Sequence, residues 1–522
     1  MKMERRKFLK YSAATVATPF LFQGQWMQAF ASAPAADLLA TFNTGRKLVL
    51  IQLDGGNDGL NMVIPISQYD NLANARRNIL VDKAQILKLT DETGLNPAMP
   101  DLTNLYKEGK VQIIQGVGYP NPNLSHFRSK DILLSASDAK SIISSGWVGR
   151  MFTRQYPGFP VGFPNSQQPH PISLTIGSTN SATCQGDLSN YSTVLKSLSS
   201  TYVSNAPNGG YPDTPFGKEL RFVNNVMEQT EGYLSVIKSA AASAKNLSSK
   251  YPAAGSNSLA DQLKLVANLI AGGLQTQLYV VSLGGWDTHS LQVASETSKL
   301  TGVHPTLLSK LSVAISAFQD DLRLMKKEEE VMGFVYTEFG RRIKSNDSLG
   351  TDHGTTWPAI VFGASVNPGI TGTNPVIPAV VGKSDNLAMQ YDFRSIYSGI
   401  YKQWFGIGEQ DVTQLLGASF PDIQVVAKST SIGDAVALPA AELKLYPNPV
   451  VDHATLSFES DGTWAQIRIY SLGGQLVKTM ERQQFQAGLQ ELYLELGNLR
   501  PSNYVLVLQQ KSGISTIKFI VR

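Results

Sequence analysis

The sequence predicts a doubly wound α/β domain with a mostly parallel sheet, followed by a small C-terminal β-sandwich. Between about residues 42 and 426, nearly continuous apolar runs, which are typical of parallel strands covered on both faces, alternate with helical patterns. From residue 443 the pattern changes to short segments in which apolar and polar residues alternate. We therefore expect folded domains at 42–426 and 443–522, joined by an alanine-rich linker at 427–442.

The composition is that of a folded protein and excludes several classes of function. Hydrophobic residues make up 42% of the 522 residues, which is enough for a large core. The 45 basic and 41 acidic residues form no concentrated basic stripe, so no nucleic-acid partner is expected. The single cysteine excludes an internal disulfide and a cysteine-rich metal site.

Residues 1–31 have the pattern of an export signal. A basic head containing Arg5 and Arg6 precedes a short apolar stretch, and Ala29-Phe30-Ala31 is an A-x-A cleavage pattern. The paired arginines resemble a twin-arginine signal, and an ordinary Sec signal is the alternative. Either signal would carry the mature protein out of the cytoplasm. The apolar stretch is too short for a membrane span of about 20 residues, and we expect no transmembrane segment in the mature protein.

Within the core, five apolar runs are the expected strands and four longer patterns the expected helices. The strands are expected at 47–53, 111–116, 278–283, 332–336 and 360–362. The helices are expected at 99–108, 216–245, 257–271 and 305–326. Ligands of doubly wound sheets bind beyond the carboxyl ends of the strands. Polar residues next to these strands are therefore the candidate site residues.

The first two strands are followed by an aspartate and by a serine–histidine pair. Asp54 ends the first strand beside two glycines, where it could bind a divalent cation or form an Asx turn. Ser125 and His126 open a helix after the second strand. Ser125 could be a helix N-cap, or a nucleophile placed where the helix terminus favours anions.

The other three strands also have ligand-type residues beside them. Asp287 and His289 follow the third strand and could bind a metal or hydrogen-bond to one another within the loop. Glu338 follows the fourth strand, and Asp352 and His353 come shortly before the fifth. Each motif alone has a structural explanation. Their recurrence at five strands favours a common site.

Seven motifs occur in order along the core. They are Leu53-Asp54-Gly55-Gly56-Asn57-Asp58-Gly59-Leu60, Ser125-His126-Phe127, Gly146-Trp147-Val148-Gly149-Arg150, Gly285-Trp286-Asp287-Thr288-His289, Glu338-Phe339-Gly340-Arg341, Gly350-Thr351-Asp352-His353-Gly354 and Tyr391-Asp392-Phe393-Arg394-Ser395-Ile396-Tyr397. In this order the core resembles the bacterial domain-of-unknown-function 1501 family. Its fold is grouped with alkaline phosphatases, sulfatases and cofactor-independent phosphoglycerate mutases, so the resemblance implies an alkaline phosphatase-like sheet.

The resemblance also implies one or two divalent metal ions, since the wider superfamily uses them on phosphate and sulfate esters. One site could be built from Asp287, His289 and His353, with Asp352 beside them. A second could be built from Asp54, Glu338 and Ser125. The second lacks an imidazole, because Phe339 stands where the superfamily has a histidine. Such an oxygen-rich site would favour magnesium, calcium or manganese over zinc.

The implied reaction is hydrolysis of a phosphate or sulfate ester outside the cell. Ser125 would be the nucleophile and His126 the acid for the leaving alcohol, while Arg128 or Arg341 would neutralise the transferred group. The alternative is a surface-displayed binding or structural protein of the same fold with little or no catalysis. The loss of the imidazole at Phe339 favours that alternative.

The C-terminal segment contains three landmarks of a sorting module. They are Leu445-Tyr446-Pro447-Asn448-Pro449, Ile469-Tyr470-Ser471-Leu472-Gly473-Gly474-Gln475-Leu476-Val477 and Lys518-Phe519-Ile520-Val521-Arg522. They resemble the C-terminal sorting domain of type IX secretion substrates in the Bacteroidota. The resemblance implies the type IX machinery as a partner, and a location outside the outer membrane or attached to the cell surface. A carbohydrate-binding or adhesive sandwich is the alternative.

Overall fold

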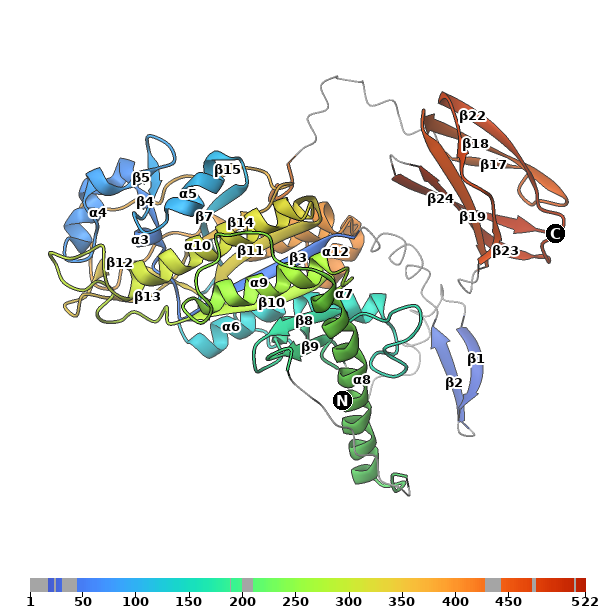
Figure 1. Ribbon diagram of the computed structural model, residues 1–522, viewed down its shortest axis with the longest axis horizontal. Coiled ribbons are helices and arrows are strands. Elements are labelled where there is room, and N and C mark those ends of the chain that lie inside the picture. Colours follow the sequence, from blue (N-terminus) through green and yellow to red (C-terminus); the bar gives the residue numbers. More distant parts are fainter. Residues whose placement is uncertain are drawn as a thin grey trace, which may run out of the picture. The chain divides into compact units, whose positions relative to one another are not determined.

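The computed structural model describes residues 17–22, 25–30, 45–187, 189–199, 210–427, 443–471, 476–510 and 513–522. The chain divides into two compact units, Met1–Lys428 and Ser429–Arg522 (Figure 1). The expected linker at 427–442 lies outside the described residues except for Ala427. Most of the expected signal at 1–31 also lies outside them. Its described parts are the antiparallel strands β1 (Ala17–Phe22) and β2 (Gln25–Phe30).

The core of the first unit is a nine-stranded sheet, which confirms the predicted fold class. Its strand order is β15-β7-β14-β11-β3-β10-β8-β9, and β16 pairs with β7. The strands are β3 (Lys47–Asp54), β7 (Val111–Gly118), β8 (Ser173–Ile176), β9 (Ser192–Leu195), β10 (Leu278–Gly284), β11 (Val331–Thr337), β14 (Trp357–Phe362), β15 (Gly369–Thr371) and β16 (Tyr391–Asp392). All pairings in the sheet are parallel except those of β14, which runs opposite to β7 and β11.

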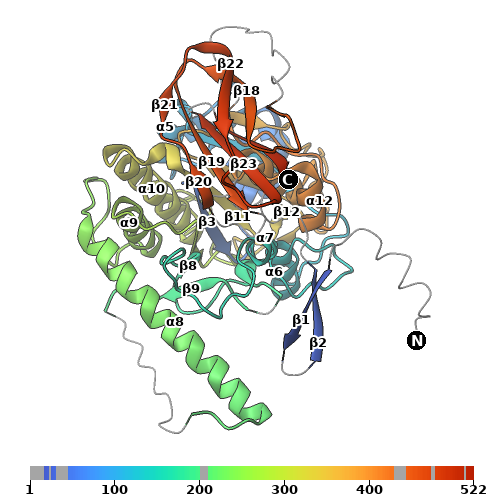
Figure 2. The same cartoon turned by 90° about the vertical axis from the view of Figure 1, so that its right-hand side faces the viewer.

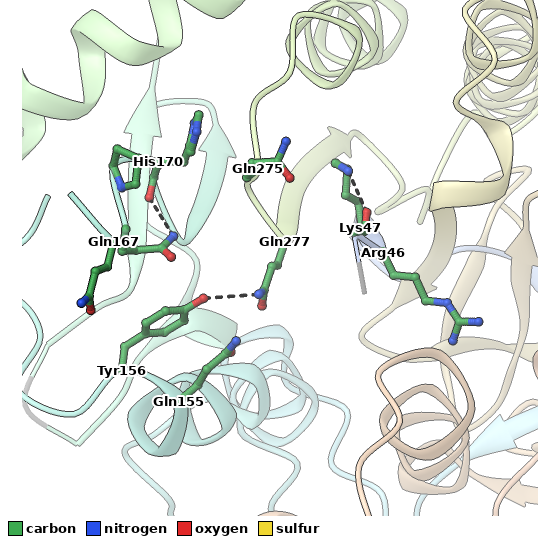
Figure 3. Close-up of a pocket in the computed structure, with 11 residues that line it drawn as sticks. Arg46, Lys47, Gln155, Tyr156, Gln167, His170, Gln275 and Gln277 are labelled. Carbon is green, nitrogen blue, oxygen red and sulfur yellow. Dashed lines mark hydrogen bonds between the residues drawn. The ribbon is translucent and has the colours of Figure 1, made fainter. Parts of the chain in front are cut away.

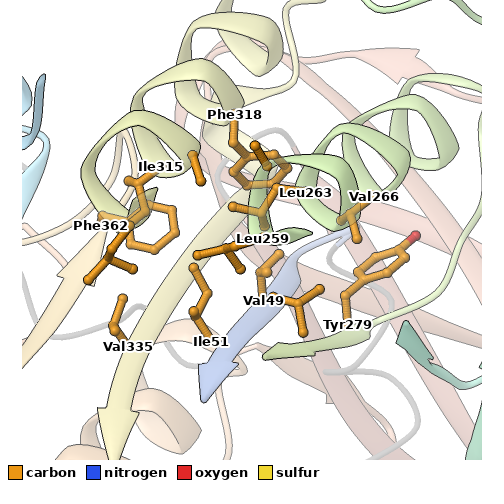
Figure 4. Close-up of a cluster of buried hydrophobic side chains, with 14 of the residues drawn as sticks. Val49, Ile51, Leu259, Leu263, Val266, Tyr279, Ile315, Phe318, Val335 and Phe362 are labelled. Carbon is orange, nitrogen blue, oxygen red and sulfur yellow. The ribbon is translucent and has the colours of Figure 1, made fainter. Parts of the chain in front are cut away.

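Two hydrophobic cores cover the two faces of this sheet. Val49 and Ile51 of β3 pack on one face and Leu48 and Leu50 on the other, because successive strand residues point to opposite faces. Figure 4 shows the first core, where α9 and α10 pack on the sheet. Each fully buried aliphatic side chain contributes about 1.5–3 kcal/mol to stability. Because both faces of the sheet are buried, the strand sequences are continuous apolar runs rather than alternating apolar and polar residues.

Helices from separate parts of the chain supply each face. The face in Figure 4 is covered by α5 (Pro100–Lys107), α8 (Pro215–Ser243), α9 (Ser258–Ala271) and α10 (Val303–Leu324). The other face is covered by α6 (His126–Ser135), α7 (Trp147–Gln155), α11 (Phe393–Gly399), the π-helix Ile400–Trp404 and α12 (Glu409–Leu416). Figure 2 shows one end of α8 extending beyond the other helices.

The reversed strand β14 brings an extra segment to the carboxyl edge of the sheet. Because β14 runs opposite to its neighbours, its first residue lies at the edge where β3, β10 and β11 end. The hairpin of β12 (Gly340–Ser345) and β13 (Thr351–Gly354) directly precedes β14. Arg341 and His353 are partners in this hairpin, so both lie beside the strand ends.

Smaller elements complete the first unit beside this edge. They are α3 (Gly59–Met62), α4 (Tyr69–Arg76) and the three-stranded sheet of β4 (Val63–Pro65), β6 (Thr93–Leu95) and β5 (Leu87–Lys88). Among the helices that the structure describes, none combines the length and apolarity needed to cross a membrane.

The second unit is a β-sandwich, as predicted. One antiparallel sheet contains β17 (Lys444–Tyr446), β18 (His453–Asp461) and β22 (Ala487–Glu495). The other contains β19 (Trp464–Ser471), β20 (Leu476–Thr479), β21 (Gln483–Gln484), β23 (Ser502–Gln510) and β24 (Gly513–Val521). Leu456 of the first sheet and Ile467 and Leu506 of the second belong to one hydrophobic core.

Candidate metal centre

Three histidines and one aspartate meet at the carboxyl edge of the main sheet. Nε2 of His289 lies 2.9 Å from Nε2 of His353 and 3.2 Å from Oδ1 of Asp287. Nε2 of His353 is 3.3 Å from the same carboxylate oxygen, and Nε2 of His126 is 3.4 Å from Oδ2 of Asp287. Potential ligand atoms of His126, Asp287 and His353 all lie within 4.8 Å of one another.

The other nitrogen of each imidazole faces an oxygen acceptor. Nδ1 of His126 lies 2.8 Å from Oε1 of Glu338, and Nδ1 of His289 lies 3.1 Å from Oδ1 of Asp352. Nδ1 of His353 lies 2.8 Å from the carbonyl oxygen of Leu124. A proton on Nδ1 of each ring would leave the three Nε2 lone pairs directed toward Asp287 and the neighbouring imidazoles. Metal-binding histidines have this arrangement of backing acceptors.

The distances between these donor atoms fit a metal ion. A tetrahedral ion with ligand bonds of about 2.1 Å separates neighbouring donors by about 3.4 Å. The three separations among His289, His353 and Asp287 are 2.9, 3.2 and 3.3 Å. With Nδ1 protonated in each ring, the Nε2 lone pairs and the carboxylate would repel one another unless a cation lies between them. The donor set therefore fits a divalent cation.

Arg341 holds the aspartate in place. Its buried guanidinium donates to Oδ1 of Asp287 at 2.8 Å, to the carbonyl oxygens of Gly55 and Gly56, and to that of Thr351 at 2.7 Å. Burial raises the pKa of Asp287, but the hydrogen bond and charge of Arg341 outweigh this effect and bring the pKa below its usual value. With its donors directed at protein oxygens, Arg341 positions the loops around the centre and has no face free for a transferred group.

Two of the predicted metal ligands lie behind the imidazoles rather than among the converging atoms. Glu338 is 1% exposed and accepts the amide of Gly55 at 2.9 Å as well as His126. Asp352 accepts from His289, and this contact together with Asn346 brings the pKa of Asp352 below its usual value despite the opposing effect of burial. Both carboxylates orient imidazoles.

Asp54 pairs with a lysine. Its Oδ1 lies 2.7 Å from Nζ of Lys130 and 2.6 Å from Nε2 of Gln52. Asp54 and Glu338 follow neighbouring positions of the paired strands β3 and β11. The structure does not bring Asp54, Glu338 and Ser125 together as a second group of converging ligands. The ammonium of Lys130 takes the place beside Asp54.

The predicted nucleophile is accessible, whereas one predicted arginine points elsewhere. Ser125 is the exposed N-cap of α6, and its side chain makes no capping hydrogen bond. It lies between Leu124, whose carbonyl holds His353, and His126. Arg128 instead pairs with Asp131 and donates to the carbonyl oxygen of Asp138 at 3.1 Å. Arg128 is thus committed to its own loop.

Phe339 forms an apolar wall behind two imidazoles. Its ring centroid lies 4.8 Å from that of His126 and 4.4 Å from that of His353, and its side chain is fully buried. A Cβ atom on Gly56 would lie 2.3 Å from the Phe339 ring. A Cβ on Gly55 would lie 2.3 Å from the backbone nitrogen of Asp287. Two glycines therefore permit the close approach of these loops.

Two parts of the chain match known families. Residues 226–396 match the family described as "Protein of unknown function (DUF1501)", and residues 444–522 match the "Secretion system C-terminal sorting domain". The first match covers about a third of the chain. This segment contains Asp287, His289, Glu338 and His353, whereas His126 comes from earlier in the chain. No curated protein matches the sequence.

The chain also resembles solved structures at very low sequence identity. A protein in the alkaline phosphatase superfamily from Vibrio parahaemolyticus is 11% identical, with 86% of this chain and 84% of that chain covered and a TM-score of 0.31. The phosphonate monoester hydrolase from Silicibacter pomeroyi is 8% identical, with 91% and 89% covered and a TM-score of 0.31. The PsFucS1 sulfatase from Pseudoalteromonas sp. is 9% identical, with 90% and 89% covered and a TM-score of 0.31.

A buried polar network lies beneath the candidate ligands that belong to residues 226–396. Oε1 of Gln292 accepts from the hydroxyls of Thr288 and Thr351, at 3.1 and 3.0 Å. Thr288 lies between Asp287 and His289 in the sequence, and Thr351 directly precedes Asp352. The Gln292 amide donates to Asp58 at 2.6 Å, and Asp58 also pairs with fully buried Arg76 at 2.8 Å. Burial tends to raise the pKa of Asp58, but Arg76 brings it below its usual value.

Sequence reasoning missed Lys130, Gln292 and Asp58 as parts of the centre. Lys130 follows His126 by four residues, which places both side chains on one face of α6. The four-residue spacing could have identified Lys130 as a neighbour of His126. Asp58 lies in the same glycine-rich motif as Asp54, whereas nothing in the sequence marks Gln292.

A separate polar hollow lies at the opposite edge of the sheet, near the first residues of β3 and β10. Gln155, Tyr156, His170, Gln275 and Gln277 are among its lining residues (Figure 3). Tyr156 and Gln277 are hydrogen-bonded to one another at 3.3 Å. None of the predicted site residues lines this hollow. The hollow is therefore separate from the predicted site residues and from the imidazole cluster at the carboxyl edge.

Proposed function

We propose that this protein is an exported, metal-dependent hydrolase that acts on phosphate or sulfate esters outside the cell. The observation that carries the proposal is the convergence of three imidazole Nε2 atoms on Asp287, with each Nδ1 held by an oxygen. The order of the motifs along the core resembles the domain-of-unknown-function 1501 family, whose fold is grouped with ester-hydrolysing enzymes, and that grouping suggests the reaction class.

One divalent ion is the proposed cofactor, with His126, Asp287, His289 and His353 as its ligands. Three nitrogens and one carboxylate favour zinc or a similar transition metal over magnesium or calcium, which prefer oxygen ligands. With a fifth coordination position open to the substrate, such an ion would stabilise negative charge on the ester oxygens. We therefore assign His126 to the metal rather than to protonation of the leaving alcohol.

Ser125 is the proposed nucleophile. It lies between Leu124 and His126, both of which contact the imidazole cluster, so its exposed hydroxyl is held beside the ion site. Attack by its oxygen on sulfur or phosphorus would release the alcohol and leave a serine ester, which water then hydrolyses. Glu338, Asp352 and Arg341 would hold the imidazoles and the aspartate still during both steps.

The sorting domain at 444–522 indicates export. We propose the type IX machinery of a Bacteroidota-type bacterium as its partner, with the mature protein released or attached to the outer cell surface. A twin-arginine or Sec signal at the N-terminus would carry the chain across the inner membrane first. The substrate would then be met outside the cell.

Metal content of the purified full chain tests the proposal. Mass spectrometry should find one tightly held transition-metal ion per chain, lost in Asp287→Ala and retained in the control Asp91→Ala, whose carboxylate is exposed and distant in sequence from the motifs. Hydrolysis of 4-nitrophenyl esters should then be lost in Ser125→Ala with the metal retained. A wild-type chain that neither retains nor rebinds metal would overturn the proposal and favour a binding or structural protein.

A further inference from the structure

Lys130 is a partly exposed cation on the helix that also carries His126 of the donor cluster. It shares a face of α6 with His126, and its Nζ donates to Asp54 at 2.7 Å. The side chains of Lys130 and Asp54 are 34% and 31% exposed, so this ion pair is partly open to solvent. An ammonium has three N–H groups, and one bond to Asp54 leaves two for a ligand.

Lys130 lies in the same bonded assembly as the ion site. Asp54 is followed by Gly55, whose amide donates to Glu338 at 2.9 Å. Glu338 in turn accepts from His126 at 2.8 Å. A short chain of contacts therefore joins the ammonium to an imidazole of the donor cluster. The two arginines expected to bind the transferred group are bonded to protein oxygens instead.

The fixed charges of this assembly limit the charge of the ligand. Four carboxylates, those of Asp54, Asp287, Glu338 and Asp352, face three cations, Lys130, Arg341 and Arg342. With neutral imidazoles, these groups leave one net negative charge, and one divalent ion would bring the site to a single positive charge. A ligand with one negative charge would neutralise that site. A second negative charge on the ligand would face the carboxylates without compensation.

We propose that Lys130 binds an anionic oxygen of the substrate and that the centre selects ester groups with a single negative charge. Sulfate monoesters and phosphate diesters have this charge, whereas phosphate monoesters carry about two charges above neutral pH. This inference rests on the proposed metal-dependent function and deepens it, because it names the class of ester.

Calorimetric titration of the zinc-loaded full chain at pH 8 tests the selection without catalysis. The probes are methyl sulfate and dimethyl phosphate, with one charge each, and methyl phosphate, with about two. We expect both singly charged probes to bind about tenfold more tightly than methyl phosphate. Whichever of the two binds more tightly identifies sulfur or phosphorus as the preferred centre. Equal or tighter binding of methyl phosphate would overturn the selection.

Variants of Lys130 test its role. Lys130→Met should weaken binding of both singly charged probes about tenfold while zinc content is unchanged, and Lys130→Arg should retain most of the affinity. The control is Lys140→Met, an exposed lysine outside the assembly, which should bind as the wild type does. Unchanged binding in Lys130→Met would overturn the assignment.

Hydrolysis assays separate this inference from the proposed function. The substrates are 4-nitrophenyl sulfate, bis(4-nitrophenyl) phosphate and 4-nitrophenyl phosphate. Selective, Lys130-dependent binding without hydrolysis of any of them would support the inference and contradict catalysis. Hydrolysis that is fastest for 4-nitrophenyl phosphate would support the ester-hydrolase proposal and contradict the charge selection.

Discussion

Phe339 fills the space beside His126 and His353 that a further ligand would need. Its ring lies within 4.8 Å of both imidazoles, measured between centroids. An aromatic wall excludes water from one side of the cluster and holds the rings by packing. Phenylalanine cannot bind a metal, but its ring restricts the movement of the two imidazoles. This is consistent with a single ion rather than two.

The contact between Gly56 and Phe339 predicts a large effect of a single methyl group. Gly56→Ala would place Cβ 2.3 Å from the ring, at a backbone φ of +79°. We expect a loss of about 2–4 kcal/mol in the free energy of unfolding, measured by urea denaturation, together with weaker metal binding. Gly273→Ala is the matched control, because Gly273 has a φ of +90° but open space around its Cβ position. Equal losses in the two variants would contradict a role for the Phe339 contact.

The threonine hydroxyls beneath the centre give a second prediction. Thr351→Val removes the donor to Oε1 of Gln292 while keeping the shape of the side chain. We expect zinc affinity to fall about tenfold in a chelator-competition assay, because the neighbouring Asp352 then loses an anchor for the loop that backs His289. Thr351→Ser keeps the hydroxyl and should retain the affinity. The prediction is wrong if the serine and valine variants bind zinc equally.

His304 gives a prediction about pH. It is fully buried and hydrogen-bonds to Asn57 at 2.9 Å, and burial is the main cause that lowers its pKa from 6.5 to about 4. Between these values the unfolded chain binds a proton that the folded chain does not, so folding stability rises with pH. Acidification from pH 7 to pH 4.5 should therefore cost up to about 3 kcal/mol from this group alone.

Urea denaturation of wild type and His304→Gln across this pH range measures that effect. Glutamine retains an amide that can donate to Asn57 but does not titrate. The free energy of unfolding of His304→Gln should fall less steeply with acidification than that of the wild type. Parallel pH profiles for the two proteins would show that His304 does not titrate in this way.

At the scale of elements, the strands and helices of the core were predictable because burial sets their pattern. The runs expected at 47–53, 278–283 and 332–336 are β3, β10 and β11, each extended by at most one residue at either end. The direction of β14 was not predictable, because a buried apolar run reads the same whichever way the strand points. That direction places His353 at the carboxyl edge.

In the candidate site, too, features set by local sequence were predictable and features set by long-range contacts were not. The end of the third expected strand predicts Asp287 and His289 at the carboxyl edge, and the reversed strand β14 adds His353 there. The structure brings atoms of these three residues within 3.3 Å of one another. The division between ligands and backing groups depends on which imidazole nitrogen each carboxylate faces, and spacing along the chain does not encode that orientation. Glu338 and Asp352 therefore resemble ligands in sequence but contact Nδ1 atoms in the structure.

Helix α6 combines three of the proposed tasks. Its N-cap is Ser125, its first residue is His126, and one turn later Lys130 reaches Asp54. Ile132 and Leu133 anchor the helix in the core on that face of the sheet. Nucleophile, metal ligand and anion-binding group would therefore keep fixed mutual positions, as proximity effects in catalysis require.

At the scale of the whole molecule, each of the two units has a hydrophobic core of its own. The ligand and backing residues of the candidate centre all belong to the first unit, and the segment that matches a sorting domain belongs to the second. The candidate centre and the segment that matches a sorting domain therefore belong to separate parts of the chain. Separate cores imply that the first unit keeps its stability without the second.

Removal of residues 443–522 tests this separation. The truncated chain should keep the zinc content and the Tm of the first unit within about 2 °C, since the ion site draws on no residue of the second unit. In the native host, the same truncation should stop the protein at the periplasm, which fractionation and immunoblotting would show. The control is Ser125→Ala in the full chain, which should still reach the outside because export does not depend on catalysis. Loss of metal on truncation would mean that the second unit supports the centre, whereas outward transport of the truncated chain would mean that the sorting domain is not its export signal.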